Sequence, residues 1–111
     1  EQVLALTRAI TGWADFDEQA LRTVARRGIT LARLVNLREG HGRHDDVLPP
    51  RLHEPLPAGP LKDRVITREE VAAIVREYYI AQGWDPETGI PTVETLRALD
   101  LPTDLLAGVT R

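Results

Sequence analysis

The sequence predicts an all-α fold of about four helices with a long proline-rich loop. Apolar residues recur at helical spacings of three and four in several segments, and no stretch alternates apolar and polar residues for long enough to form a strand. Five of the eight prolines fall between residues 40 and 66, where they exclude a helix or a central strand. We expect residues 1–111 to form a single helical domain.

Composition limits the classes of protein that this chain can represent. The chain has 111 residues, and its hydrophobic content of 42% with 28% charged residues is ordinary for a globular protein. No apolar run approaches the roughly 20 residues that cross a bilayer, and no secretion signal is visible. The 14 basic and 17 acidic residues are mixed along the chain. We therefore expect a cytoplasmic protein that binds neither nucleic acid nor membrane.

The chain contains no cysteine. Disulfides, thiolate zinc sites and thiolate-bound iron–sulfur clusters therefore cannot form from its own side chains.

The N-terminal half predicts two helices. Val3, Leu6 and Ile10 follow helical spacing, and Gly12 predicts the end of the first helix. No capping residue precedes this helix, which is compatible with a start upstream of Glu1. Asp15 or Asp17 is expected to cap the second helix. The predicted buried stripe of this helix consists of Leu21, Val24, Gly28, Leu31 and Val35, widened by Ile29 and Leu34. A glycine on the buried face indicates that another backbone crosses the helix closely at Gly28.

The C-terminal half predicts two further helices after the proline-rich loop. Thr67 and Glu70 have the spacing of a capping box, and Gly83 predicts the end of the third helix. Thr92 is expected to cap a short fourth helix, and the tail from 101 to 109 adds one turn or frays. The predicted buried residues of these two helices are Val71, Ile74, Val75 and Tyr78, then Val93, Leu96 and Leu99.

The most polar cluster of the sequence lies in the proline-rich loop, between residues 40 and 66. His41, His44 and Asp45 could in principle bind a divalent metal, but His-x-x-His in a glycine-rich loop does not fix both imidazoles on one face, and Arg43 opposes a cation. The simpler interpretation is that Asp45 or Asp46 accepts hydrogen bonds from loop N–H groups and pairs with Arg43 or Arg51. An interface role is the remaining alternative, since a loop of this length usually contacts another surface. The candidate interface residues are His41, Arg43, His44, Asp45, Asp46 and Arg51.

No independent active site is predicted. The aromatic residues Trp13, Tyr78, Tyr79 and Trp84 lie at or near predicted helix ends and are expected to pack in the core, not to stack on a ligand. The sequence contains no nucleophile elbow, phosphate-binding loop or dinucleotide fingerprint. We assign no catalytic, cofactor-binding or metal-binding residue to this chain.

Several short blocks, taken in order, resemble the C-terminal end of the aldehyde:ferredoxin oxidoreductases. The resemblance covers nearly the whole chain, and the order and spacing of the blocks carry it. They are Thr11-Gly12-Trp13, Asn36-Leu37-Arg38-Glu39-Gly40, Arg43-His44-Asp45-Asp46-Val47-Leu48-Pro49-Pro50-Arg51, Glu54-Pro55-Leu56-Pro57, Tyr78-Tyr79-Ile80-Ala81-Gln82-Gly83-Trp84-Asp85, Thr88-Gly89-Ile90-Pro91-Thr92 and the stretch from Leu96 through Leu101.

This resemblance implies an oxidoreductase that converts aldehydes to carboxylic acids at a tungsten or molybdenum centre held by two pterins. It also implies a 4Fe-4S cluster that passes electrons to ferredoxin. Because the cluster needs cysteine thiolates, this chain is expected to carry no cofactor and to be inactive alone. Its helices are expected to wall the cofactor cavity, with the remaining domains or subunit of the enzyme as partner.

Two alternatives stay open at this point. One is a stand-alone helical interaction or regulatory module derived from the family. The other is an independent metal-dependent enzyme using His41, His44 and Asp45. The aldehyde, the choice between tungsten and molybdenum, and the oligomeric state depend on residues or contacts outside this sequence.

Overall fold

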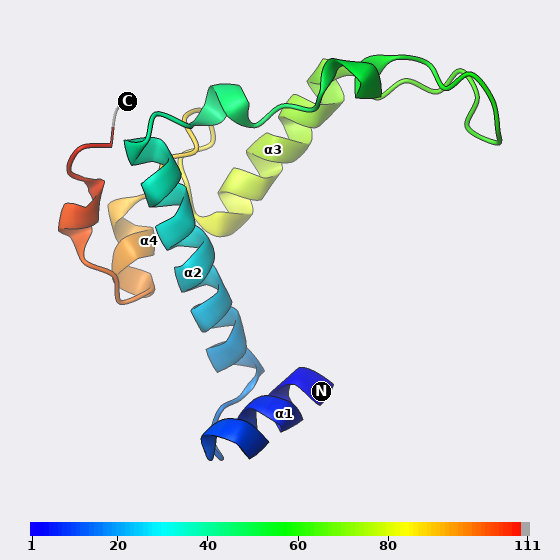
Figure 1. The fold of residues 1–111 in the computed structure, drawn as a ribbon. Coiled ribbons are helices and arrows are strands. Elements are labelled where there is room, and N and C mark those ends of the chain that lie inside the picture. Colours follow the sequence, from blue (N-terminus) through cyan, green and yellow to red (C-terminus); the bar gives the residue numbers. More distant parts are fainter. Residues whose placement is uncertain (110–111) are drawn as a thin grey trace.

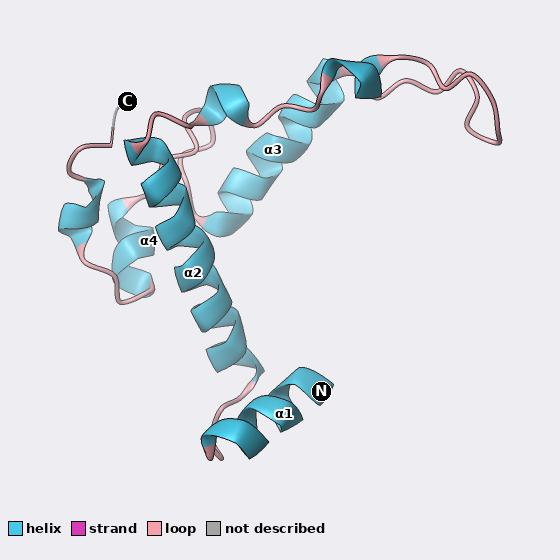
Figure 2. Ribbon diagram, in the orientation of Figure 1, coloured by secondary structure: helices cyan, strands magenta, loops and turns pink. Residues whose placement is uncertain are grey.

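A computed structural model describes residues 1–109. Figures 1 and 2 show an all-α fold with four α-helices, as predicted, and no strand in the described range. Three short 3₁₀ helices accompany them. The elements are α1 (Gln2–Thr11), α2 (Glu18–Arg38), η1 (Arg43–Asp45), η2 (Pro50–His53), α3 (Arg68–Gln82), α4 (Val93–Ala98) and η3 (Thr103–Leu106).

Local capping signals determine where the helices begin and end. Asp17 caps α2, because its carboxylate accepts a hydrogen bond of 2.8 Å from the Ala20 N–H. Thr67 and Glu70 form the predicted capping box: the Glu70 N–H donates to the Thr67 hydroxyl at 3.1 Å, and the Thr67 N–H donates to the Glu70 carboxylate at 2.8 Å. The bond from the Thr67 N–H lowers the pKa of Glu70. Gly83 ends α3 in the left-handed conformation at φ 74°.

The proline-rich loop contains more local structure than its composition predicts. The expectation that no helix forms between residues 40 and 66 is wrong at two places, η1 and η2, although each is only three or four residues long. Pro50 opens η2, where its fixed φ suits the first helical position and its missing N–H has no partner to lose.

A small core joins α2 to the C-terminal elements. Leu34 of α2 packs with Leu96, Leu99 and Leu101, which confirms the predicted burial of Leu96 and Leu99. The tail adds one turn, η3, and Leu105, Leu106 and Val109 cover this cluster.

The predicted buried stripe of α2 is correct at Leu34, which is 2% exposed, but wrong along most of its length. Val24 and Val35 are 54% and 58% exposed, and a Cβ on Gly28 would meet nothing within 4 Å, so no backbone crosses there. The buried residues of α2 are instead Thr30, Arg33, Leu34 and Leu37. Both stripes follow the helical period, and the elements that pack on α2 select the second one.

The buried face of α3 also differs from the prediction. Ile74 is 67% exposed and Tyr78 is exposed, whereas the adjacent Tyr79 is 1% exposed. The reason lies on α2, because Tyr79 is the residue that reaches the buried Arg33.

The molecule is extended for its length. Its radius of gyration is 18.2 Å, and its principal extents are 52 × 38 × 21 Å, whereas a compact chain of this length has a radius of about 13 Å. Figure 1 shows the cause: α1 stands apart at one end, and the loop before α3 reaches away from the body at another. No helix among residues 1–109 combines the length and hydropathy needed to cross a bilayer.

Candidate functional site

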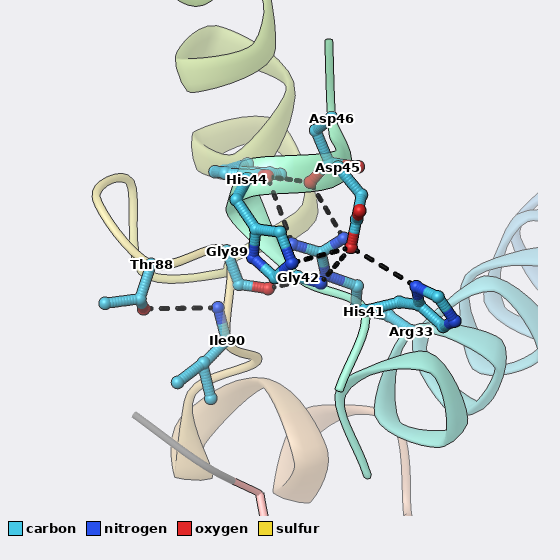
Figure 3. Close-up of polar contacts among 10 residues, drawn as sticks. Arg33, His41, Gly42, His44, Asp45, Asp46, Thr88, Gly89 and Ile90 are labelled. Atoms are coloured by element: carbon cyan, nitrogen blue, oxygen red, sulfur yellow. Dashed lines mark hydrogen bonds and ion pairs between the residues drawn. The ribbon is translucent and has the colours of Figure 1, made fainter. Parts of the chain in front are cut away.

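The best-connected polar group of the structure is the buried guanidinium of Arg33. It lies in the C-terminal half of α2 and is 8% exposed. Its Nη1 forms an ion pair of 2.8 Å with Asp46 Oδ2, and its Nε donates a hydrogen bond of 2.9 Å to the Gly89 carbonyl (Figure 3). Its Nη2 donates to the Tyr79 hydroxyl at 3.1 Å. One side chain therefore ties together α2, the loop after it, α3 and the turn before α4.

Aromatic rings enclose the same guanidinium. The Arg33 Cζ lies 5.2 Å from the ring centroid of Tyr79 and 5.5 Å from that of Trp84. Both distances are within the range of cation–π attraction, which is stronger where water is excluded. The two rings lie 5.9 Å apart, centroid to centroid. Together with the hydrogen bonds, these contacts compensate the cost of removing a charged group from water.

The Tyr79 hydroxyl and the Asp46 carboxylate form the second half of the network. Tyr79 donates a hydrogen bond to Asp46 Oδ2, the oxygen that also faces Arg33. Burial raises the pKa of the Tyr79 phenol, and the bond to Asp46 raises it further, whereas Arg33 opposes both effects. Tyr79 therefore stays neutral and acts as a donor. The network pairs one positive group with one negative group.

The turn from Asp85 to Ile90 is shaped to bring the Gly89 carbonyl to Arg33. The Asp85 carboxylate accepts hydrogen bonds from the Thr88 side chain and backbone N–H, both at 2.7 Å, and these bonds lower its pKa. Gly89 has φ +68°, and a Cβ there would lie 2.3 Å from Arg33 Nη2 and 2.6 Å from Tyr79 Cζ. Glycine is required at this position both by its backbone conformation and by lack of space.

A second polar cluster lies in the loop after α2, around Asp45. Its carboxylate accepts a hydrogen bond of 3.0 Å from the Gly42 N–H, which lowers its pKa. His41 Nδ1 and His44 Nε2 lie 3.3 and 3.2 Å from the same oxygen (Figure 3). Both imidazoles are exposed, so this cluster stabilises the turn from the outside.

The six candidate interface residues of the loop make different contacts in the structure. The prediction that Asp45 accepts a loop N–H is confirmed, but the predicted pairing with Arg43 or Arg51 is wrong. Asp46 pairs with Arg33 because that guanidinium is already buried and needs a counter-charge. Arg43 lies over the Tyr79 ring at 5.7 Å, and Arg51 is exposed and forms no ion pair within residues 1–109.

Sequence reasoning missed Arg33, Tyr79 and Gly89 as members of one site. The available signal was the position of Arg33 on a helical stripe with Thr30, Leu34 and Leu37. A charge at such a position predicts a buried, paired group. Its partners lie 46 and 56 positions away for Tyr79 and Gly89, so no local pattern could identify them.

The residues present do not fit the cofactors of a tungsten oxidoreductase. Within residues 1–109 no three His, Asp or Glu side chains are placed to hold a metal ion, and the chain has no cysteine. His41 and His44 approach Asp45 instead. The Arg33 network holds separate segments of the chain in fixed positions relative to one another. This role involves neither proton transfer nor ligand binding.

The Asp45 cluster predicts an acid dependence of stability. A group whose folded-state pKa is lowered contributes stability that is complete above its ordinary pKa, here 3.8, and is lost as the pH falls through the lowered value. Acidification below about pH 4 should therefore lower the free energy of unfolding more steeply for the native chain than for the Asp45→Asn variant. Urea unfolding at successive pH values measures this difference.

The control for this prediction is Asp15→Asn, which alters an exposed carboxylate that accepts no hydrogen bond within residues 1–109. Its pH profile should follow that of the native chain. Coincident profiles for the native chain and Asp45→Asn would show that the Gly42 bond contributes nothing.

The fold and the Arg33 network define an all-α chain in which one buried guanidinium joins separate segments, with no metal-binding group among residues 1–109. Comparison with protein families matches residues 1–101 to the family described as "Aldehyde ferredoxin oxidoreductase, domains 2 & 3". The chain therefore belongs to the aldehyde ferredoxin oxidoreductase family.

Curated relatives support this assignment. The chain is 38% identical over 106 residues to the "Aliphatic sulfonate oxidoreductase, WOR-like subunit" of Pyrococcus furiosus, a match that covers 91% of this chain and 17% of the relative. It is 35% identical over 88 residues to the "Tungsten-containing aldehyde ferredoxin oxidoreductase" of the same organism, covering 78% of this chain and 14% of the relative. The protein of that name from Pyrococcus abyssi is 35% identical over 98 residues, covering 86% of this chain and 15% of the relative.

The matched stretch is thus a small part of each relative, at most 17% of its length. No solved structure matches the chain significantly.

Proposed function

We propose that this chain acts as the C-terminal helical scaffold of a tungsten-dependent oxidoreductase and is inactive until it joins the cofactor-bearing portion. In this role residues 1–111 form one domain whose helices wall the cofactor cavity and substrate channel. The complete enzyme would oxidise an aldehyde to a carboxylic acid at a tungsten- or molybdenum-bispterin. A 4Fe-4S cluster would pass the electrons to ferredoxin in the cytoplasm.

The observation that carries the proposal is the imbalance between buried and exposed hydrophobic side chains. Among residues 1–109, seven large hydrophobic residues are buried and seventeen are exposed. A chain that functions alone rarely leaves so much apolar surface uncovered, and large exposed apolar patches mark interaction sites. The extended shape also supports the proposal, because the elements of a chain with a radius of gyration of 18.2 Å do not cover one another's apolar side chains.

The proline-rich loop is the surface that we assign to this contact. Leu52, Leu56 and Leu61 are exposed along it, and His41, His44 and Arg51 are exposed in its first part. Apolar residues bordered by polar ones are typical of a protein interface with a polar rim. Asp46 and Arg43 belong to the inner edge of this surface, because both also contact the Arg33 network.

The test is association between this chain and the cofactor-bearing portion of the enzyme, produced with tungsten. We expect a stable complex that is isolated by size-exclusion chromatography and shows visible absorption, whereas the chain alone is colourless. Leu56→Gln should weaken the complex about tenfold, because it removes roughly 1.5 kcal/mol or more of apolar burial. The matched control is Lys62→Gln in the same loop, which should leave the affinity within about twofold.

A monodisperse monomer that never binds the cofactor-bearing portion would contradict the proposal. That outcome would favour the alternative of a stand-alone helical interaction or regulatory module. Equal effects of Leu56→Gln and Lys62→Gln would leave the scaffold role intact but remove the loop from the interface.

A further inference from the structure

An open groove of about 480 Å³ runs between α2 and α3. Figure 1 shows the two helices diverging from the region where the C-terminal part of α3 approaches α2. The α2 wall is formed by Ile29, Ala32 and the polar Asn36, and the α3 wall by Ile74, Val75 and Tyr78. Trp84 closes the groove at the end of α3.

The walls of this groove are apolar except for Asn36, and they are uncovered. Ile29 and Ala32 lie three positions apart, and Ile74 and Tyr78 four apart, so each pair occupies one helix face. Ile29, Ile74 and Tyr78 are 42%, 67% and 44% exposed. Two facing helix surfaces of this kind provide ridges and grooves into which a third helix can pack.

The floor of the groove is electrically neutral. It contains Arg33 and Asp46, which are paired with each other, and the neutral Tyr79. A charged occupant would lose hydration without gaining a free counter-charge. The groove is therefore complementary to an uncharged, apolar surface.

Trp84, which lines the groove, carries a donor that the rest of the described chain does not satisfy. The indole N–H of Trp84 is buried, and no acceptor among residues 1–109 reaches it. Buried donors are nearly always paired in complete proteins. An occupant that brings an acceptor, with a small adjustment of the indole, would remove this cost.

We propose that the groove between α2 and α3 receives one apolar α-helix from the cofactor-bearing portion of the enzyme, with a hydrogen-bond acceptor on the face toward Trp84. This inference rests on the proposed function and names the partner element. The occupant is a helix because an added strand would bury backbone N–H and C=O groups where the apolar walls offer no partners. The source is the remainder of the enzyme because the relatives extend far beyond the stretch that this chain matches, which is at most 17% of their length.

The experiment places the photo-cross-linker p-benzoylphenylalanine at Ile74 in the complex of the full chain with the cofactor-bearing portion. The matched control places it at Ala73, which is exposed but does not line the groove. After irradiation, mass spectrometry identifies the cross-linked peptides. Position 74 should cross-link to one contiguous helical segment outside these 111 residues, at a yield at least fivefold above that of position 73.

The other outcomes overturn the inference. A complex that forms without a cross-link from position 74 would show that another surface mediates assembly, and the scaffold role would survive. Cross-links to the proline-rich loop or to a second copy of the chain would assign the groove to those occupants. Failure of the two portions to associate would overturn the scaffold role and the groove proposal together.

Discussion

Replacement of Arg33 by alanine should lower the free energy of unfolding by about 3 kcal/mol. The substitution removes an ion pair with Asp46, hydrogen bonds to Gly89 and Tyr79, and the cation–π contacts. It also leaves Asp46 as a partly buried charge without its counter-ion, and because the Asp46 side chain retains 30% exposure the expected cost lies at the lower end for buried pairs. Urea unfolding followed by circular dichroism and tryptophan fluorescence measures the change.

Two further variants make this result specific to the network. Arg22→Ala removes another arginine of α2 whose ion pair with Glu18 is exposed, and its effect should be a small fraction of that of Arg33→Ala. Asp46→Asn combined with Arg33→Ala should cost clearly less than the sum of the two single changes, because each already removes the shared ion pair. Similar effects of Arg22→Ala and Arg33→Ala, or strict additivity with Asp46→Asn, would mean that the network does not stabilise the fold.

Gly89→Ala should destabilise the chain by a similar amount, about 3 kcal/mol. Its φ of +68° makes any Cβ unfavourable, and that Cβ would overlap both the Arg33 guanidinium and the Tyr79 ring. Neither group can move freely, because each is held by the other and by Asp46. The expected consequence is partial opening of the turn between Asp85 and Ile90, measurable as lower urea stability and a changed near-ultraviolet circular dichroism from Trp84 and Tyr79.

Gly12→Ala separates the backbone effect from the packing effect. Gly12 has a comparable φ of +74°, but a Cβ there would meet nothing within 4 Å. It should therefore cost only about 1 kcal/mol. If Gly89→Ala were no more destabilising than Gly12→Ala, the close approach of Gly89 to Arg33 would have no energetic importance.

The elements of this fold were predictable because their signals are local. The capping box of Thr67 and Glu70 and the stop at Gly83 act on backbone groups within four positions, and both work in the structure as the sequence predicts. Asp17 is one of the two residues expected to cap α2, and it does so. The family resemblance was equally accessible, since it depends on the order of short blocks along the chain. The absence of cysteine likewise means that the side chains of this chain cannot supply thiolate ligands.

The burial of particular faces was not predictable in the same way. On α2 the apolar stripe through Val24 and Val35 is exposed, while the stripe containing Arg33 is buried. Helical periodicity identifies the candidate faces of an amphipathic helix, but the neighbouring elements decide which of them is covered. Among residues 1–109 no element covers the stripe through Val24 and Val35, and this face is left exposed.

Sequence therefore determined the four helices, several of their capping signals and the family, because each depends on residue types or short-range spacing. Tertiary structure alone decided that Arg33 is the centre of the polar network and that Tyr79, not Tyr78, is buried. It also placed the groove between α2 and α3. These features depend on contacts between segments tens of positions apart, where the geometry of packing, and not the local pattern, selects the partners.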